Sequence, residues 1–326
     1  MLKYILRRVG YILIVFVLMS MVLFGLFKAI PADPVLMYME GRQSGMTPQE
    51  YQSSYDQTRE RLGLDRSVPV QYAIWMRNML TGDFGRTVTN KPVREEIKAP
   101  LGNTVRLNIA VMICVFAVTI PLGVRTAVHK GTLFDRGVQL VTMLGYSLPS
   151  FIIALVVMLI FSIRLGWLPL TGSMTAGFEG RGIALVWDRA LHMTGPVMVM
   201  TFMSVGSLTR YIRAAMTDAL RMDYIRTARA KGLREKTVIY THAFRNSMLP
   251  FITVLIGWFV ALFSGSVVVE TLFIWHGMGK LFVDSILQMD YAVALALQMF
   301  YVILGLAGNL VADIAYTMAD PRVRLT

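Results

Sequence analysis

Long apolar runs dominate the hydrophobic pattern of this chain. Six stretches of 18 or more residues contain no Asp, Glu, Lys or Arg. A bilayer core accommodates about 20 mostly apolar residues per helix, whereas runs of about 10–14 are more typical of buried helices in soluble proteins. The pattern therefore predicts an all-α membrane protein with six transmembrane helices. The predicted spans are 9–27, 107–124, 137–163, 190–209, 246–269 and 291–312.

The first apolar run follows Lys3, Arg7 and Arg8, as the hydrophobic segment of a signal peptide would. It is long for such a segment, and residues 28–34 contain no convincing small-x-small cleavage site. We therefore expect an uncleaved first helix. The expected divisions of the chain are an N-terminal end with the first span (1–29), an external insertion (30–100) and a five-span core (101–326).

Basic residues indicate how the spans are oriented. Both ends and alternate loops (125–136 and 210–245) hold 17 Lys and Arg against 5 Asp and Glu, and the two opposite short loops hold only 4 Lys and Arg. Because short cytoplasmic loops are enriched in Lys and Arg, both termini are predicted to be cytoplasmic. The net charge of +12 follows from this topology, so no nucleic-acid partner is needed to explain it.

The external insertion reads as two short helices separated by turns. Thr47 is a candidate N-cap with Pro48 at the first helical position, which predicts a polar helix over 47–62. A second, amphipathic helix is expected over 70–80. The segment is too small for an enzyme domain with its own core. It is either a lid packed on helix ends or a docking surface for an external partner, and the sequence leaves both open.

The predicted membrane helices contain no residues that would drive transport or catalyse a reaction by themselves. Their cores carry no charged residue, which argues against a proton- or sodium-driven carrier and against an intramembrane protease. A single cysteine and four histidines offer little for a metal centre. The segment 277–280 resembles a phosphate-binding loop but lacks its first glycine and its final Ser or Thr. We therefore expect no catalytic residue, metal or cofactor in this chain.

Prolines, small residues and serines mark a candidate polar path through the spans. Pro121, Pro149, Pro196 and Pro250 are candidate bends, since proline weakens a membrane helix. Helix–helix contact through small and polar residues remains the plainer alternative. The candidate pathway or gate residues are Ser147, Pro149, Ser204, Ser207, Gly257, Ser264, Ser266, Glu270 and His276.

The cytoplasmic segment 210–245 is unusually long for a connection between helices. An Ala-rich helix is expected to end at Gly232 in a left-handed cap, followed by a second short helix over 235–246. An apolar flank of that helix is predicted from Val238, Ile239, Ala243 and Phe244. Two short helices joined in this way suit either docking into a groove on a soluble partner or binding to a lipid surface, and the sequence pattern leaves both open.

This loop resembles the EAA loop of ATP-binding-cassette importers, in the version found in the dipeptide and oligopeptide permease family. The resemblance extends over almost the whole chain and is nearest to the first permease of the pair, which carries the long external insertion. The segments that carry it are 6–8, 31–34, 82–85, 147–151, 165–169, 223–233, 242–250, 270–273, 277–279 and 320–324. Two departures are Arg226 at the position of the family's glutamate and His276 where a proline is common.

The resemblance implies a type I importer fold and half of a translocation pathway, in a bacterial or archaeal cytoplasmic membrane. It implies as partners a second homologous permease, two ABC ATPase subunits that use ATP and Mg, and an extracytoplasmic peptide-binding protein. The segment 210–250 would be the coupling loop. The implied coupling residues are Ala228, Ala230, Gly232, Leu233, Val238, Ile239, His242, Phe244 and Arg245.

Other functions stay open at this stage. The same architecture imports nickel–metallophore complexes, glutathione or oligosaccharides in the resembling family. A membrane sensor or docking protein with a basic cytoplasmic loop is a more remote alternative, which the lack of a cytoplasmic signalling domain disfavours.

Overall fold

The computed structural model describes residues 2–31, 33–39, 46–61, 63–248 and 251–319. In these ranges the chain is helical, with one isolated β-bridge between Arg86 and Pro92, so the all-α prediction is confirmed. The chain divides into two compact units, which are described separately. The first contains Met1–Gly102 and Leu281–Ala307, and the second contains Asn103–Lys280 and Gly308–Thr326.

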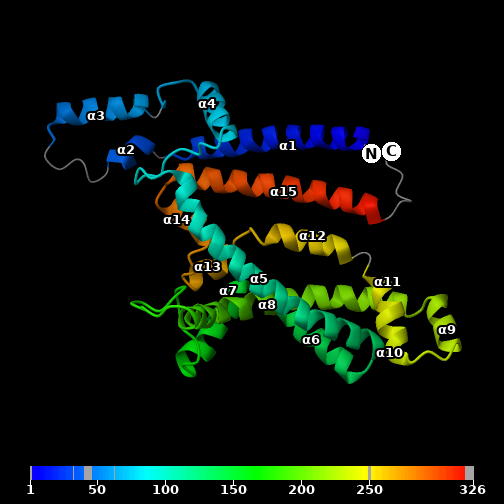
Figure 1. Ribbon diagram of the computed structural model, residues 1–326. Coiled ribbons are helices and arrows are strands. Elements are labelled where there is room, and N and C mark those ends of the chain that lie inside the picture. Colours follow the sequence, from blue (N-terminus) through cyan, green and yellow to red (C-terminus); the bar gives the residue numbers. More distant parts are fainter. Residues whose placement is uncertain (1, 32, 40–45, 62, 249–250, 320–326) are drawn as a thin grey trace. The chain divides into compact units, whose positions relative to one another are not determined.

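Helices α1 to α4 and most of α14 and α15 form the first unit (Figure 1). The predicted cap of α3 is confirmed: the Glu50 N–H donates to the Thr47 hydroxyl at 3.3 Å, and the Glu50 carboxylate accepts from the Thr47 N–H at 2.8 Å. This reciprocal pair satisfies two backbone donors at the helix start. The helices are α1 (Leu2–Ala29), α2 (Pro34–Met39), α3 (Pro48–Arg61), α4 (Val68–Leu80), α14 (Met278–Leu287) and α15 (Tyr291–Ala319).

The second unit contains the remaining helices, of which α5 begins in the first unit. They are α5 (Val93–Val128), α6 (Leu133–Ser147), α7 (Ser150–Val157), the π-helix η1 (Met158–Arg164), α8 (Ile183–Ala219), α9 (Asp223–Ala230), α10 (Glu235–Thr237), the π-helix η2 (Val238–Phe244), α11 (Arg245–Ser247), α12 (Phe251–Ala261) and α13 (Val267–Leu272).

Two of the six predicted spans are not single continuous helices among the described residues. Four described helices are each long and apolar enough to cross a membrane, and the predicted span 137–163 adds a fifth only as a bent pair. Its two halves meet at 106° where Leu148 is extended and Pro149 caps α7. Proline lacks the N–H that would continue the helix, so the predicted bend at this proline is confirmed. The four continuous helices are Leu6–Ala29, Val93–Val128, Ile183–Ala219 and Tyr291–Ile314.

The predicted span 246–269 is also interrupted. Helix α12 covers only 11 residues, and residues 262–266 separate it from α13. Pro250, the other candidate bend in this span, lies outside the described residues, as does the motif at 320–324.

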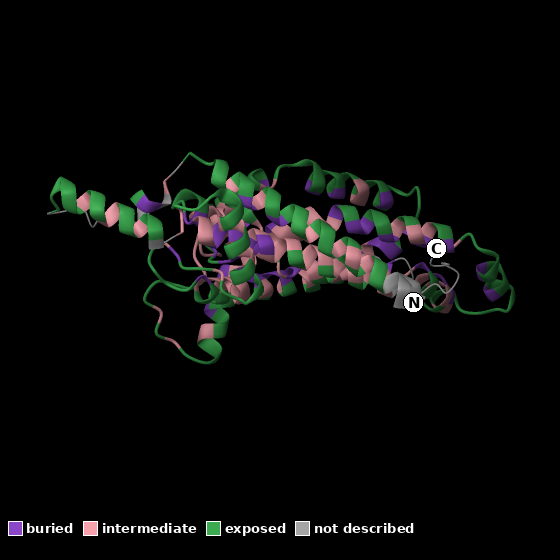
Figure 2. Cartoon of the chain, turned by 90° about the horizontal axis from the view of Figure 1, so that it is seen from above, coloured by how far each residue is buried: buried purple, intermediate pink, exposed green. Residues whose placement is uncertain are grey.

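Burial divides most helices into an inner and an outer face (Figure 2). The main core of the second unit is built from α5, α8, α9 and η2 around fully buried Ile212, Met216 and Ile225. Of the four membrane-length helices, α1 is the least buried, with Leu13, Leu18 and other large apolar side chains more than half exposed. Such surfaces are expected where a helix meets lipid or another membrane subunit.

Candidate functional site

A cavity of about 540 Å³ lies within the second unit, between α5, α8, α12 and the turn at 262–266. Four predicted pathway residues line it, namely Ser204, Gly257, Ser264 and Ser266. None of its lining side chains is ionisable. The lining residues are Asn108, Val111, Met200, Ser204, Val254, Gly257, Trp258, Ala261, Leu262, Ser264, Gly265 and Ser266.

Asn108 fixes the wall of this cavity at the interrupted helix. Its buried Nδ2 donates to the carbonyl oxygens of Ala261, Leu262 and Ser264, at 3.1, 2.9 and 3.0 Å. The end of a helix leaves carbonyl groups without helical partners, and one amide here serves three of them. Sequence reasoning missed this residue, although an asparagine within an otherwise apolar run was its visible signal.

Glu270 connects the segments that follow the interruption between α12 and α13. It is 1% exposed, and its Oε1 accepts a 2.8 Å hydrogen bond from the Thr104 hydroxyl of α5. Its Oε2 accepts from the backbone N–H groups of Gly279 and Lys280, at 2.7 and 3.1 Å. The Thr104 oxygen in turn accepts from the Met278 N–H at 2.8 Å. Glu270 therefore positions the 277–280 segment on α5 and does not line the cavity.

Glycines allow the two sides of this joint to approach each other. A Cβ on Gly265 would collide with the backbone nitrogen of Gly279, and a Cβ on Gly279 would lie 2.7 Å from the Val267 nitrogen. A Cβ on Gly277 would lie 2.5 Å from the Glu270 carboxylate. The Gly277-Met278-Gly279 motif is thus explained by close backbone packing and not by phosphate binding. We refer to residues 262–280 with Thr104 and Asn108 as the packed joint.

The remaining pathway candidates lie away from the cavity. Ser147 is exposed at the end of α6, and Pro149 is the N-cap of α7. Ser207 is exposed and donates to the Ser204 carbonyl in its own helix. His276 is exposed, and its carbonyl accepts from Asn103 at 2.9 Å.

The loop at 210–245 folds as the sequence predicted, as a helix, a glycine and a second helix. Gly232 has φ +72°, the Leu233 N–H donates to the Ala228 carbonyl at 3.4 Å, and the Gly232 N–H donates to the Arg229 carbonyl at 2.9 Å. These two bonds define a Schellman cap with glycine in the left-handed position. The chain then continues through α10, η2 and α11 beside α9 (Figure 1). We call residues 223–247 the knob.

The predicted apolar flank packs in large part against the chain's own core. Val238 and Ala243 are fully buried, and Ile239 and Phe244 pack against the same core cluster. Burial of these apolar side chains stabilises the knob, while Ile239 and Phe244 remain partly exposed. Ala228 is buried as well. The predicted coupling residues that remain accessible are Ala230, Gly232, Leu233 and Arg245, with His242 partly covered.

The accessible face of the knob is basic. Two exposed ion pairs lie on it, with the Arg229 Nη2 2.6 Å from the Glu235 Oε1 and the Arg226 Nη1 3.6 Å from the Asp223 Oδ1. The hydrogen bond from Arg229 lowers the pKa of the Glu235 carboxyl. The exposed cations are Arg226, Arg229, Lys231, Arg234, Lys236 and Arg245.

An ion pair that the sequence did not reveal connects α6 to α8. Arg213 contacts buried Asp135 in a bidentate arrangement, with both nitrogen–oxygen distances 2.7 Å. Asp135 also accepts from the Gly131 N–H at 2.8 Å, which ties it to the turn before α6. The partners are 78 positions apart, so the sequence offered no local signal of the pair. Among the described residues, no group of three His, Cys, Asp or Glu side chains is placed to hold a metal.

Comparison with known proteins identifies the family. A model of the binding-protein-dependent transport system inner membrane component matches residues 119–325, and the corresponding N-terminal model matches residues 1–117. The chain is 38% identical over 325 residues to the oligopeptide transport system permease protein AppB of Bacillus subtilis, with 99% of each chain covered. It is 33% identical to the di/tripeptide transport system permease protein DppB of Pseudomonas aeruginosa, also with 99% of each chain covered.

Among solved structures, the MetNI methionine ABC transporter in inward-facing conformations is similar, at 13% identity and a TM-score of 0.48, over 67% of this chain and 95% of that one. The match is too weak to carry an argument. The family matches alone confirm both the family resemblance and the prediction of a non-catalytic transport subunit. The chain belongs to the family of binding-protein-dependent transport system inner membrane components.

Proposed function

We propose that this chain is the permease subunit of an ATP-binding-cassette importer for dipeptides and oligopeptides. The observation that carries this proposal is the near-complete alignment with permeases named for oligopeptides and for di- and tripeptides. We propose a second permease, two ABC ATPases that use ATP and Mg, and an external peptide-binding protein as its partners. Both termini are proposed to face the cytoplasm, on the evidence of the basic loops.

The cavity beside α12 suits a cargo of variable sequence. Its volume falls in the range of about 300–1,000 Å³ typical of small-molecule sites. Serine hydroxyls offer hydrogen bonds to a peptide backbone, and the absence of ionisable lining groups avoids selecting one side-chain charge. Specificity is then a property of the external binding protein, while this chain supplies passage.

Helix α8 provides a physical link between the cavity and the knob. It runs without interruption from Ile183 to Ala219, about 55 Å at 1.5 Å per residue. Met200 and Ser204 line the cavity, whereas Ile212 and Met216 pack in the core that holds the knob. A displacement of the knob by the ATPases would therefore reach the cavity through one rigid element, and ATP binding would bias between two arrangements of the pathway.

Reconstituted transport tests this function. Proteoliposomes that contain both permeases and both ATPases, with the binding protein outside and ATP inside, are expected to accumulate labelled di- and oligopeptides. Accumulation should persist when an uncoupler collapses the proton gradient at constant ATP. Uptake of nickel–metallophore complexes, glutathione or oligosaccharides without peptide uptake would replace the cargo assignment, and the absence of any ATP-dependent uptake would favour the sensor alternative.

Labelling tests the proposed orientation. With Cys114 replaced by Ala, an impermeant thiol reagent added outside is expected to modify a Glu60→Cys variant and to spare a Glu235→Cys variant. Both positions are exposed, so only the side of the membrane differs. Modification of residue 235 from outside would overturn the topology.

A further inference from the structure

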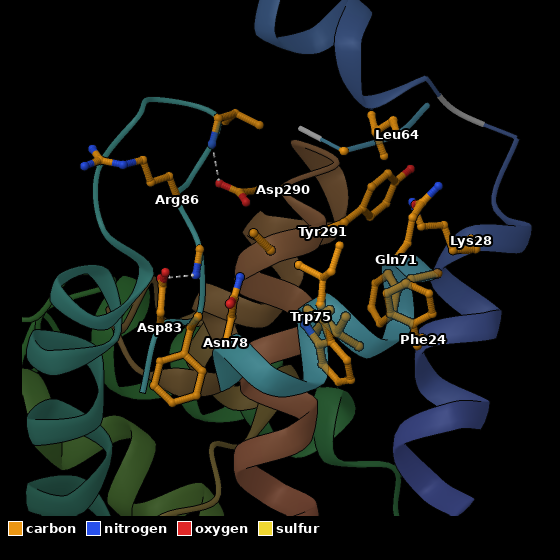
Figure 3. Close-up of a pocket in the computed structure, with 18 of the residues that line it drawn as sticks. Phe24, Lys28, Leu64, Gln71, Trp75, Asn78, Asp83, Arg86, Asp290 and Tyr291 are labelled. Atoms are coloured by element: carbon orange, nitrogen blue, oxygen red, sulfur yellow. Dashed lines mark hydrogen bonds between the residues drawn. The ribbon is translucent and has the colours of Figure 1, made fainter. Parts of the chain in front are cut away.

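A second cavity, of about 370 Å³, lies entirely within the first unit (Figure 3). It is enclosed by the last turns of α1, one face of α4, the loop at 83–88 and the first turn of α15. The proposed transport function does not use it. Its apolar lining includes Phe24, Phe27, Ile74, Trp75 and Leu295.

The position of this cavity corresponds to the polar boundary of a membrane. Helices α1 and α15 are both of membrane length, and the cavity lies where α1 ends and α15 begins. The rings of Phe27 and Tyr291 are in edge contact with centroids 5.8 Å apart, so these two helix ends are at the same level. Trp75 packs on Phe24 at 5.4 Å. Aromatic side chains gather in this way at the level of lipid headgroups.

Of the polar groups that line the cavity, the Lys28 ammonium is available to bind a ligand. The Asp83 carboxylate accepts from the Gly85 N–H at 3.0 Å, and the Asp290 carboxylate accepts from the Val88 N–H at 2.9 Å, as Figure 3 shows. Both acids are therefore engaged in holding the loop. The Lys28 ammonium lies 5.7 Å from the Phe24 ring centroid, and no carboxylate within the described residues forms an ion pair with it.

We propose that this cavity binds an anionic phospholipid, with its phosphate at Lys28 and an acyl chain along the aromatic floor. A phosphate supplies a negative charge that pairs with the Lys28 ammonium, and a charge-assisted hydrogen bond is stronger than a neutral one. The apolar floor next to a cationic rim matches an amphiphile whose head and tail are adjacent.

Lipid retention by the purified chain tests this proposal. Native mass spectrometry is performed on the chain in detergent, after incubation with equal amounts of phosphatidylglycerol and phosphatidylcholine. The expected result is retention of phosphatidylglycerol over phosphatidylcholine, reduced about tenfold by Lys28→Gln because one charged contact is lost. Lys91→Gln, at an exposed lysine outside the cavity lining, is the matched control and should retain the lipid as the wild type does.

Further variants and a competitor distinguish binding in this cavity from general attraction to lipid. Lys28→Arg keeps the charge and should restore retention, whereas Trp75→Ala should weaken it by shortening the apolar floor. Glycerol phosphate, the head without a tail, should compete poorly. Equal loss in the Lys28→Gln and Lys91→Gln variants, or equal retention of the two lipids, would overturn the proposal. These outcomes do not depend on ATP-driven uptake, so they leave the transport function to its own test.

Discussion

The packed joint and the knob both interrupt helices with glycine, but for different physical reasons. In the joint, Gly265 and Gly279 are in such close contact that no side chain fits. In the knob, Gly232 has open space around it and is required only for its positive φ. The joint is therefore determined by contacts within the chain, whereas the knob is determined by its backbone and leaves its outer face accessible to a partner.

The largest effect is expected at the joint, for Gly265→Val. The new side chain would collide with the Gly279 backbone, and overpacking of this kind costs about 3 kcal/mol. We expect little monodisperse protein and a lowered Tm in detergent. Gly257→Val is the control, because a Cβ there meets nothing within 4 Å, although it lines the same cavity. Equal stability of both variants would show that the joint is not tightly packed.

The buried pair Asp135–Arg213 connects the knob's supporting helix to α6, so Asp135→Asn comes next. Removing one partner of a buried ion pair costs at least about 3 kcal/mol of folding free energy. Because Arg213 is partly exposed, the loss for this variant is expected to be close to that lower limit. A reduced Tm with retained membrane insertion is expected. Asp218→Asn, at an exposed aspartate, serves as the control. If both variants unfold at the wild-type temperature, the pair contributes nothing to the fold.

A smaller effect is expected for Gly232→Val in the knob. A branched residue in the left-handed region costs about 1–2 kcal/mol, so the chain should still fold while the second helix of the knob is redirected. Co-purification with the ATPases and peptide-stimulated hydrolysis should fall. Gly232→Asn should preserve both, since asparagine tolerates this conformation. Normal coupling in the valine variant would contradict the importance of the cap.

The smallest effect is expected for Glu235→Gln on the surface of the knob. Exposed ion pairs contribute less than about 1 kcal/mol, so the Tm near neutral pH should hardly change. The bond to Arg229 lowers the pKa of Glu235, so its small contribution is present above the carboxyl's unfolded pKa and lost as the pH falls through the lowered value. Melting curves of wild type and variant should therefore converge in acid. Melting curves of wild type and variant that separate as the pH falls would contradict this prediction.

The sequence predicted the parts of this molecule that have local causes. The Thr47 cap, the Gly232 cap and the bend at Pro149 each follow from a residue and its immediate neighbours. The interruption of α12 did not follow in the same way. It depends on Asn108, about 150 residues earlier, whose amide serves the freed carbonyls.

The predicted coupling flank shows a second limit of sequence reasoning. The periodicity of Val238 and Phe244 correctly identified an apolar face but contained no information about what covers it. The chain's own core does so, and the face left for a partner is basic. Likewise, the sequence marks Glu270 only as a candidate pathway or gate residue, because its partner Thr104 lies on α5, far away in the chain.

Site-specific cross-linking in the assembled transporter tests the central claim most directly, that the accessible face of the knob meets the ATPases. Single cysteines are introduced as Leu233→Cys on the exposed face and Phe244→Cys on the core-facing flank, in a chain with Cys114 replaced by Ala. A short bifunctional reagent is expected to join residue 233 to an ATPase subunit, with a yield that changes on addition of ATP, and to leave residue 244 unjoined. Cross-links from residue 244 alone, or from neither position, would contradict the account.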